Sequence, residues 1–145
     1  MHRAIRSALR SLTPAILLMG SLASPLVLAH GDVLPQPVDV STLKPLGETL
    51  LEDNPYRGDA EAIKVGTSGY AQNCARCHGL QGMSGGMSPD LREMDSDREA
   101  DKYFLGVTMR GRTRNGKVYM PPFKDTMSQE AIWAIRAYVE SLPKP

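Results

Sequence analysis

The stretch Cys74-Ala75-Arg76-Cys77-His78 spells C-x-x-C-H, a pattern typical of covalent attachment of a c-type haem. Two cysteines three residues apart can each form a thioether to a haem vinyl group, and the histidine that follows them is held close enough to bind the iron from one face. The 145 residues contain only these two cysteines. We therefore expect one covalent haem c, with Cys74 and Cys77 as the thioether donors and His78 as an axial ligand.

Two other chemistries use a C-x-x-C pair. A redox-active dithiol of the thioredoxin kind needs a strand before the pair and a helix start after it, whereas helix-like sequence comes before Cys74. A structural zinc site needs two further ligands, and outside the motif and the leader the chain offers one more histidine, His30. The pattern thus favours covalent haem, with dithiol chemistry as the main alternative.

The first 29 residues are typical of a secretory signal peptide. Three arginines and no acidic residue lie within the first ten positions, and the apolar stretch 12–28 leads to a small-residue cleavage site at Ala29. Prolines and a glycine interrupt this stretch, which argues against a retained membrane anchor. We expect residues 1–29 to be cleaved after Ala29 and the protein to function in the periplasm.

The remaining residues, 30–145, fit one small domain. Removing the leader, which carries three arginines and no acid, changes the net charge from +1 to −2. That balance gives no argument for nucleic acid or an anionic membrane as a partner. We expect a soluble monomer without stable membrane insertion, with its cofactor inside a modest core.

Residues 30–58 are predicted to form an extended N-terminal arm, because four prolines recur and no helical apolar period is sustained. The arm either wraps the domain or hangs free. The folded domain is predicted to cover residues 59–145, beginning with a helix over 59–73 that Asp59 caps. Gly66 and Gly69 on that helix indicate close approach of another helix.

Two more helices are predicted. One covers residues 98–110, and the other follows the N-cap candidate Ser128 and stops before Pro143. The side chains expected to face inward are Ala100, Tyr103, Phe104 and Val107 on the former and Ile132, Trp133, Ile135, Tyr138, Val139 and Leu142 on the latter. The C-terminal helix is the expected partner of the 59–73 helix, so Trp133 is interpreted as a packing residue rather than an electron relay.

Met120 is the expected second axial ligand of the iron. Pro121 and Pro122 follow it, forcing residue 120 to be extended and stiffening the strap that would present its sulfur. A neutral thioether opposite histidine favours the reduced iron and leaves no open site. The alternatives among the downstream methionines are Met109 and Met127.

Two further features concern the surroundings of the haem. The Pro89 carbonyl, in the turn Ser88-Pro89-Asp90-Leu91, is well placed to accept the Nδ1 proton of His78 and fix the ring. The basic run over 110–117 either pairs with haem propionates or forms a solvated charged loop.

Taken together, these residues resemble a class I cytochrome c over roughly 60–145. The strings His30-Gly31-Asp32-Val33, Asn54-Pro55-Tyr56-Arg57 and Val118-Tyr119-Met120-Pro121-Pro122-Phe123 are more narrowly similar to the PedF-type cytochromes c (cytochrome c-550) of periplasmic quinoprotein ethanol dehydrogenase systems. The resemblance implies an all-α fold with helices packed around one covalent haem. One departure is the segment after Leu91, which in that family can be longer and carry additional cysteines.

The resemblance also implies a function: an electron-transfer protein, not an enzyme, that takes single electrons from a PQQ-dependent alcohol dehydrogenase and passes them toward a terminal oxidase or another cytochrome. We expect outer-sphere transfer through a haem edge lined by residues such as Ala75, Gly82 and Met83. Two alternatives stay open. One is a haem enzyme or gas sensor with an open sixth site, and the other is a cytochrome subunit of a membrane oxidoreductase complex.

Overall fold

The computed structural model describes residues 34–86 and 88–145. The predicted leader and His30 lie outside the described residues. The described elements are the helices α1 (Ala60–Asn73), α2 (Ala75–His78), α3 (Arg98–Arg110) and α4 (Gln129–Ser141), the short 3-10 helices η1 (Leu80–Gly82) and η2 (Leu91–Glu93), and the strands β1 (Arg112–Arg114) and β2 (Lys117–Met120). The protein is therefore mostly helical, in agreement with the predicted class I cytochrome c fold.

The longer helices begin at polar caps that the sequence carries. The Asp59 carboxylate accepts a hydrogen bond from Ala62 N at 2.7 Å, and the Ser128 hydroxyl accepts one from Ala131 N at 3.4 Å. Such caps satisfy backbone N–H groups that the first turn leaves without partners. The predicted limits of the first, third and C-terminal helices agree with α1, α3 and α4.

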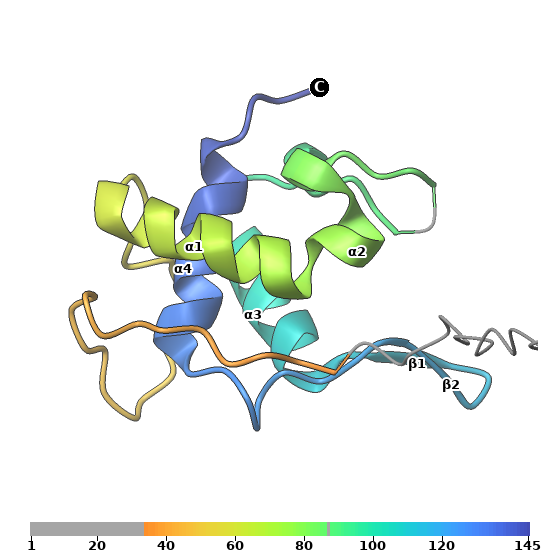
Figure 1. Cartoon of the computed structure of the whole chain (residues 1–145), viewed down its shortest axis with the longest axis horizontal. Coiled ribbons are helices and arrows are strands. Elements are labelled where there is room, and N and C mark those ends of the chain that lie inside the picture. Colours follow the sequence, from red (N-terminus) through yellow and green to blue (C-terminus); the bar gives the residue numbers. More distant parts are fainter. Residues whose placement is uncertain (1–33, 87) are drawn as a thin grey trace, which may run out of the picture. The chain divides into compact units, whose positions relative to one another are not determined.

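Helices α1 and α4 cross at direct backbone contact (Figure 1). A Cβ atom on Gly66 would stand 1.9 Å from the carbonyl oxygen of Ala134, and one on Gly69 would stand 3.1 Å from the Ile135 side chain. Only glycine permits the Gly66 approach, because any side chain would overlap the facing backbone. The prediction that these glycines mark a helix contact is confirmed, and α4 is the partner.

The inner face of α3 differs from the prediction. Its buried residues include Asp101, Phe104 and Leu105, whereas Tyr103, predicted to face inward, is 56% exposed. Asp101 can be buried because its carboxylate accepts a hydrogen bond from Arg136 Nε at 2.8 Å, and a paired charge tolerates burial that an isolated charge would not. The buried face of α3 therefore includes Asp101 and excludes Tyr103.

Strands β1 and β2 form an antiparallel hairpin that the sequence analysis did not predict (Figure 1). The turn is Asn115-Gly116, and both residues have positive φ angles, +50° and +74°. That combination is typical of a tight hairpin turn. The hairpin leads directly from the end of α3 to Met120.

The arm packs on the helices over its described part, 34–58. Gln36 N donates to the Asn73 side chain at 2.7 Å, and Asn54 N donates to the Asp101 carboxylate at 2.8 Å. The Gln129 amide at the start of α4 bonds three backbone groups of the segment 47–51. Within the part that the structure describes, the arm therefore wraps the domain. No helix among these residues is long and apolar enough to cross a membrane.

Candidate haem site

The C-x-x-C-H motif lies where one helix ends and a shorter one begins. Cys74 is the C-cap residue of α1, and its N–H donates to the Tyr70 carbonyl at 2.8 Å. The four residues of α2 then turn back, with Cys77 N and His78 N both donating to the Cys74 carbonyl, at 3.1 and 2.9 Å. The two cysteines and the histidine therefore lie within one short helical turn, as attachment at two thioethers and one iron ligand requires.

The environment of Cys74 argues against the alternative dithiol chemistry. Burial, followed by the nearby Cys77, raises the pKa of the Cys74 thiol to about 12. Redox-active C-x-x-C pairs instead depend on a lowered thiol pKa, at a helix start or beside a cation. A partly buried thiol with a raised pKa is poorly suited to thiol–disulfide exchange at neutral pH.

The structure places the His78 ring against the turn that precedes η2. His78 Nδ1 lies 3.0 Å from the carbonyl oxygen of Pro89. In the tautomer that carries a proton on Nδ1, the ring donates to this carbonyl, and Nε2 is left as the donor to a metal. Asp90 follows as the N-cap of η2 and is paired with Arg92 at 2.7 Å, so the turn that supplies the carbonyl is itself fixed.

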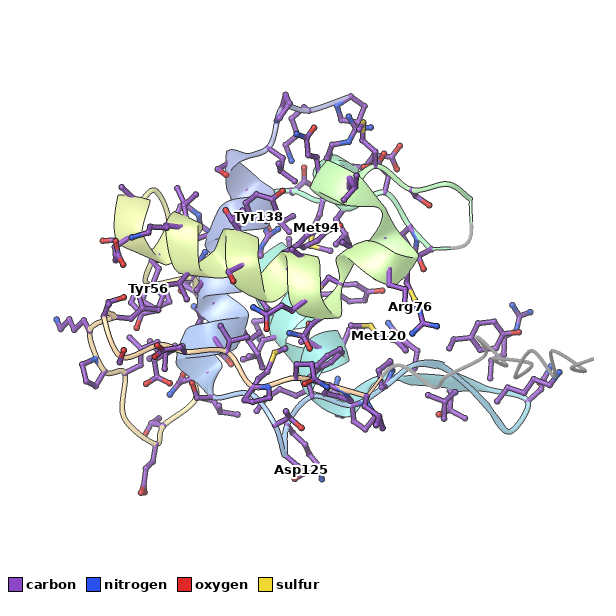
Figure 2. All side chains as sticks on the ribbon, viewed as in Figure 1. Tyr56, Arg76, Met94, Met120, Asp125 and Tyr138 are labelled. Atoms are coloured by element: carbon purple, nitrogen blue, oxygen red, sulfur yellow. The ribbon has the colours of Figure 1, made fainter. Side chains whose placement is uncertain are left out.

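Met120 ends β2 and begins the proline strap. Its side chain is half-buried and points from the hairpin toward the helices (Figure 2). After the two prolines, Phe123 N donates to the Thr108 carbonyl at 3.1 Å and the Phe123 ring is buried. The strap is thus anchored to the last turns of α3, directly after the residue predicted to bind iron.

Gly111 is a further positioning residue that the sequence analysis missed. It ends α3 with φ +69°, and a Cβ atom there would stand 2.4 Å from the Met120 carbonyl oxygen and 2.8 Å from the Pro121 carbonyl carbon. The Met120 backbone can lie where it does only because residue 111 has no side chain. A glycine directly after a predicted helix is the sequence signal for such a position.

The competing methionines occupy different environments. Met127 is a core residue, 4% exposed, in the turn before α4. Met109 lies in the last turn of α3 and is half-buried against the core. Neither has a proline strap or a stiffened, extended backbone at its position, so the local structure favours Met120 over both.

Tyr70 ties α1 to the loop that follows the motif. Its hydroxyl donates to the Gly79 carbonyl at 2.8 Å and accepts from Gly82 N at 3.1 Å. Burial raises the pKa of Tyr70, so the neutral phenol needed for these two bonds is maintained. Gly79 itself has φ +75°, and a Cβ there would overlap the Met83 carbonyl. The chain therefore turns sharply after His78.

Trp133 supplies a test of whether these residues fit a haem. Its side chain is fully buried on α4, and its Nε1–H has no hydrogen-bond partner among the described residues. Indole N–H groups are usually paired when buried, so this orphaned donor fits a site that receives an additional polar group. Together with two sulfurs, an oriented imidazole and a thioether, the residues present fit a haem with carboxylate substituents.

The predicted haem-edge rim is only partly accessible. Met83 is 46% exposed and the neighbouring Leu80 is 76% exposed, but Gly82 is buried against Arg92 and Leu142. Gly82 therefore cannot contribute to a docking face, and the prediction for this residue was wrong. Its burial follows from the Tyr70 hydrogen bond, which draws the loop inward.

A helical domain in which C-x-x-C-H ends the first helix, the C-terminal helix crosses that helix and a methionine strap follows the third helix is a class I c-type cytochrome. The family model described as "Cytochrome C oxidase, cbb3-type, subunit III" matches residues 61–139. This chain belongs to that family of c-type cytochromes, and its cofactor is covalently bound haem c.

The curated relatives agree with this assignment. The chain is 48% identical to cytochrome c550 of Pseudomonas aeruginosa over 131 residues, which cover 88% of this chain and 90% of that protein. It is 35% identical, over 56% of its length, to 11% of the quinohemoprotein alcohol dehydrogenase ADH-IIG of Pseudomonas putida. It is also 31% identical to cytochrome c6 of Cladophora glomerata, over 89% of that protein. No solved structure gives a significant match. The chain is a c-type cytochrome that functions in electron transfer.

Proposed function

We propose that His78 and Met120 are the axial ligands of the haem iron and that Cys74 and Cys77 form the two thioether bonds. The observation that carries this proposal is the 3.0 Å contact between His78 Nδ1 and the Pro89 carbonyl, which orients the ring and strengthens Nε2 as a donor. When bound in this way, haem c supplies a one-electron Fe(II)/Fe(III) couple whose potential a methionine ligand raises.

The ligand assignment is tested by near-infrared absorption of the ferric protein, matured in a host that attaches c-type haem. Methionine-sulfur ligation gives a weak charge-transfer band in this region. We expect the band in the wild type and its loss in Met120→Ala. Met109→Ala is the matched control, because Met109, which lies at the end of α3, is half-buried like Met120. Loss of the band in the control alone would contradict the assignment.

The biological role proposed is that of a monomeric periplasmic carrier between a PQQ-dependent alcohol dehydrogenase and a terminal oxidase or another cytochrome. Two similarities support it. One is to cytochrome c550 over most of both chains, and the other is to part of two quinohemoprotein alcohol dehydrogenases of Pseudomonas putida, ADH-IIG and ADH IIB. With both axial positions filled by protein, the chain binds no substrate at iron and functions by outer-sphere transfer.

Stopped-flow mixing with a reduced PQQ alcohol dehydrogenase tests the donor. We expect the dehydrogenase to reduce the ferric cytochrome in a second-order reaction. A cytochrome that ascorbate reduces but the dehydrogenase does not would contradict the donor assignment. Rapid carbon monoxide binding to the ferrous protein at neutral pH would instead indicate an open sixth site and the enzyme or sensor alternative.

Export is tested separately from redox chemistry. We expect the secreted protein to begin at His30 and to fractionate with the periplasm, because the leader is predicted to be cleaved after Ala29. N-terminal sequencing of the isolated holoprotein measures this. A chain that retains residues 1–29 and stays with the membrane would contradict the periplasmic carrier.

A second candidate is a cytochrome subunit of a membrane oxidoreductase complex. The description of the matching family model, an oxidase subunit, favours it. Co-purification of the cleaved protein with an integral membrane complex in mild detergent would support this candidate. Recovery in the periplasmic fraction as a single chain supports the free carrier.

A further inference from the structure

Basic charge is concentrated in one segment of the chain. Residues 102–124 contain six basic side chains and no acidic one, whereas the other described residues contain eight basic and fifteen acidic side chains. The segment comprises most of α3, the β1–β2 hairpin and the strap after Met120. A domain that is acidic elsewhere thus carries a single strongly basic region, which gives it a pronounced charge asymmetry.

The basic side chains of the hairpin lack acidic partners. Arg112, Arg114 and Lys117 are exposed, and none of them forms an ion pair with any residue that the structure describes. Elsewhere in the described chain, arginines such as Arg92 and Arg98 are each paired with a carboxylate. Unpaired charges of one sign on one hairpin repel one another, and an acidic surface placed beside them would relieve this repulsion.

Exposed apolar and aromatic side chains lie among these charges. Val118 and Tyr119 on β2 are each 64% exposed, and Tyr103 on α3 is 56% exposed. The Arg112 guanidinium lies over the Tyr103 ring, 5.4 Å from its centroid, and donates to the Tyr103 hydroxyl at 2.9 Å. Arginine and tyrosine are enriched at the centres of protein interfaces, and here each holds the other in place before any partner binds.

We propose that the β1–β2 hairpin is a docking surface for an acidic patch on the electron-donating dehydrogenase. This inference rests on the proposed function and names the surface through which the cytochrome would contact its electron donor. The strand that carries Val118 and Tyr119 continues without a break into Met120, so a partner bound there contacts the same short strand that supplies the proposed iron ligand. An anionic membrane fits less well, because the rest of the described domain has an excess of seven acidic side chains.

Charge reversal at the hairpin tip tests the proposal. Arg114 and Lys117 face each other next to the turn, at the end of the hairpin away from Met120. The variant Arg114→Glu/Lys117→Glu is expected to be reduced by the dehydrogenase about tenfold or more slowly at low ionic strength, and the difference should shrink at high salt. Its reduction potential and near-infrared band should match those of the wild type.

The matched control is Lys44→Glu/Lys64→Glu, which changes the net charge equally at two exposed lysines outside the basic segment. It should lose less than the hairpin variant. Equal slowing of both variants would indicate a net-charge effect and overturn the proposal. If the dehydrogenase reduces the wild type and the hairpin variant at the same rate, the docking surface is overturned but the donor assignment stands. A wild type that the dehydrogenase does not reduce overturns the donor assignment and this inference with it.

Binding to vesicles of anionic phosphatidylglycerol decides between a protein and a lipid surface. The wild type is expected not to bind them at moderate ionic strength. Binding that the hairpin variant loses, together with an unchanged rate with the dehydrogenase, would assign the hairpin to a membrane and overturn the proposal.

Discussion

Gly111 and Met120 are packed so closely that residue 111 can have no side chain: a Cβ atom would stand 2.4 Å from the Met120 carbonyl oxygen. The two residues lie together at the open end of the β1–β2 hairpin, where Arg112 pairs with Met120. The hairpin therefore closes over Gly111, and the position of the Met120 backbone depends on the absence of a methyl group nine residues earlier in the chain.

We predict that Gly111→Ala weakens or abolishes methionine ligation. The added methyl group meets backbone atoms that cannot rotate away, and φ +69° is itself unfavourable for alanine. The near-infrared charge-transfer band of the ferric protein should be lost or reduced. Gly116→Ala is the control, since Gly116 has φ +74° but a Cβ atom would meet nothing within 4 Å. If both variants keep the band, Gly111 does not position Met120.

The α1–α4 crossing gives a prediction on stability. Gly66→Ala would place a methyl group 1.9 Å from the Ala134 carbonyl oxygen, and separating two packed helices costs more than the roughly 1 to 3 kcal/mol of ordinary overpacking. We expect a loss above about 3 kcal/mol in urea unfolding of the holoprotein. Gly106→Ala is the helical control, because its methyl group would meet only the end of the flexible Arg110 side chain. A Gly66→Ala variant as stable as the control would refute the direct contact.

A buried ion cluster joins the arm, α3 and α4. Asp101 accepts from Arg136 Nε at 2.8 Å, from Arg57 at 2.5 Å and from Asn54 N at 2.8 Å. Glu140 pairs with both Arg57 and Arg136, at 2.9 and 3.4 Å. Asp101 and Arg136 are both fully buried, so removing the Asp101 charge takes away the shorter of the two carboxylate contacts of Arg136, in a medium where charge is costly.

We predict that Asp101→Asn lowers the free energy of unfolding by about 3 to 5 kcal/mol. The substitution keeps the shape of the side chain but leaves the buried Arg136 charge with only the longer contact to Glu140. Glu52→Gln is the control: it neutralises a carboxylate that pairs with an arginine of α3, Arg98, but at the surface, where no measurable change is expected. An Asp101→Asn variant as stable as the control would show that Glu140 alone compensates Arg136.

The sequence was sufficient for the three longer helices and the motif, because their signals are local. Asp59 and Ser128 cap the helices that follow them, and Gly66 marked the helix contact. The burial of Asp101 was not predictable in the same way. Its partner Arg136 lies 35 residues away, and a pattern of apolar residues contains no information on which charged side chains will meet inside the core.

The hairpin was missed for a different reason. Every residue of the two strands except Met120 is exposed. Neither strand therefore shows the alternation of apolar and polar residues by which strands are recognised. The turn residues Asn115 and Gly116 did carry a signal, since this dipeptide favours tight hairpin turns. The 3.0 Å contact between His78 and Pro89 needed only the local turn to be placed, and the geometry agrees with that expectation.

The attachment of the arm to α4 gives a prediction for acidic pH. Glu130 Oε1 accepts a hydrogen bond from Leu46 N at 2.9 Å. Burial raises the pKa of Glu130, but the hydrogen bonds from Leu46 N–H and the Ser128 hydroxyl outweigh burial, so the pKa lies below its ordinary value of 4.5. A carboxylate with a lowered pKa in the folded state stabilises the protein above the unfolded-state pKa, and this contribution is lost as pH falls through the folded-state value.

We therefore expect Glu130→Gln to be less stable than the wild type above pH 4.5, by about 0.5 to 1 kcal/mol after allowance for solvent screening. The difference should disappear as pH falls below that value, because the wild-type side chain then becomes neutral like glutamine. Urea unfolding of both holoproteins across this pH range measures it. Glu48→Gln, an exposed change in the same arm, should show no such convergence. A Glu130→Gln difference that stays constant with pH would mean that the charge of Glu130 does not strengthen the bond to the arm.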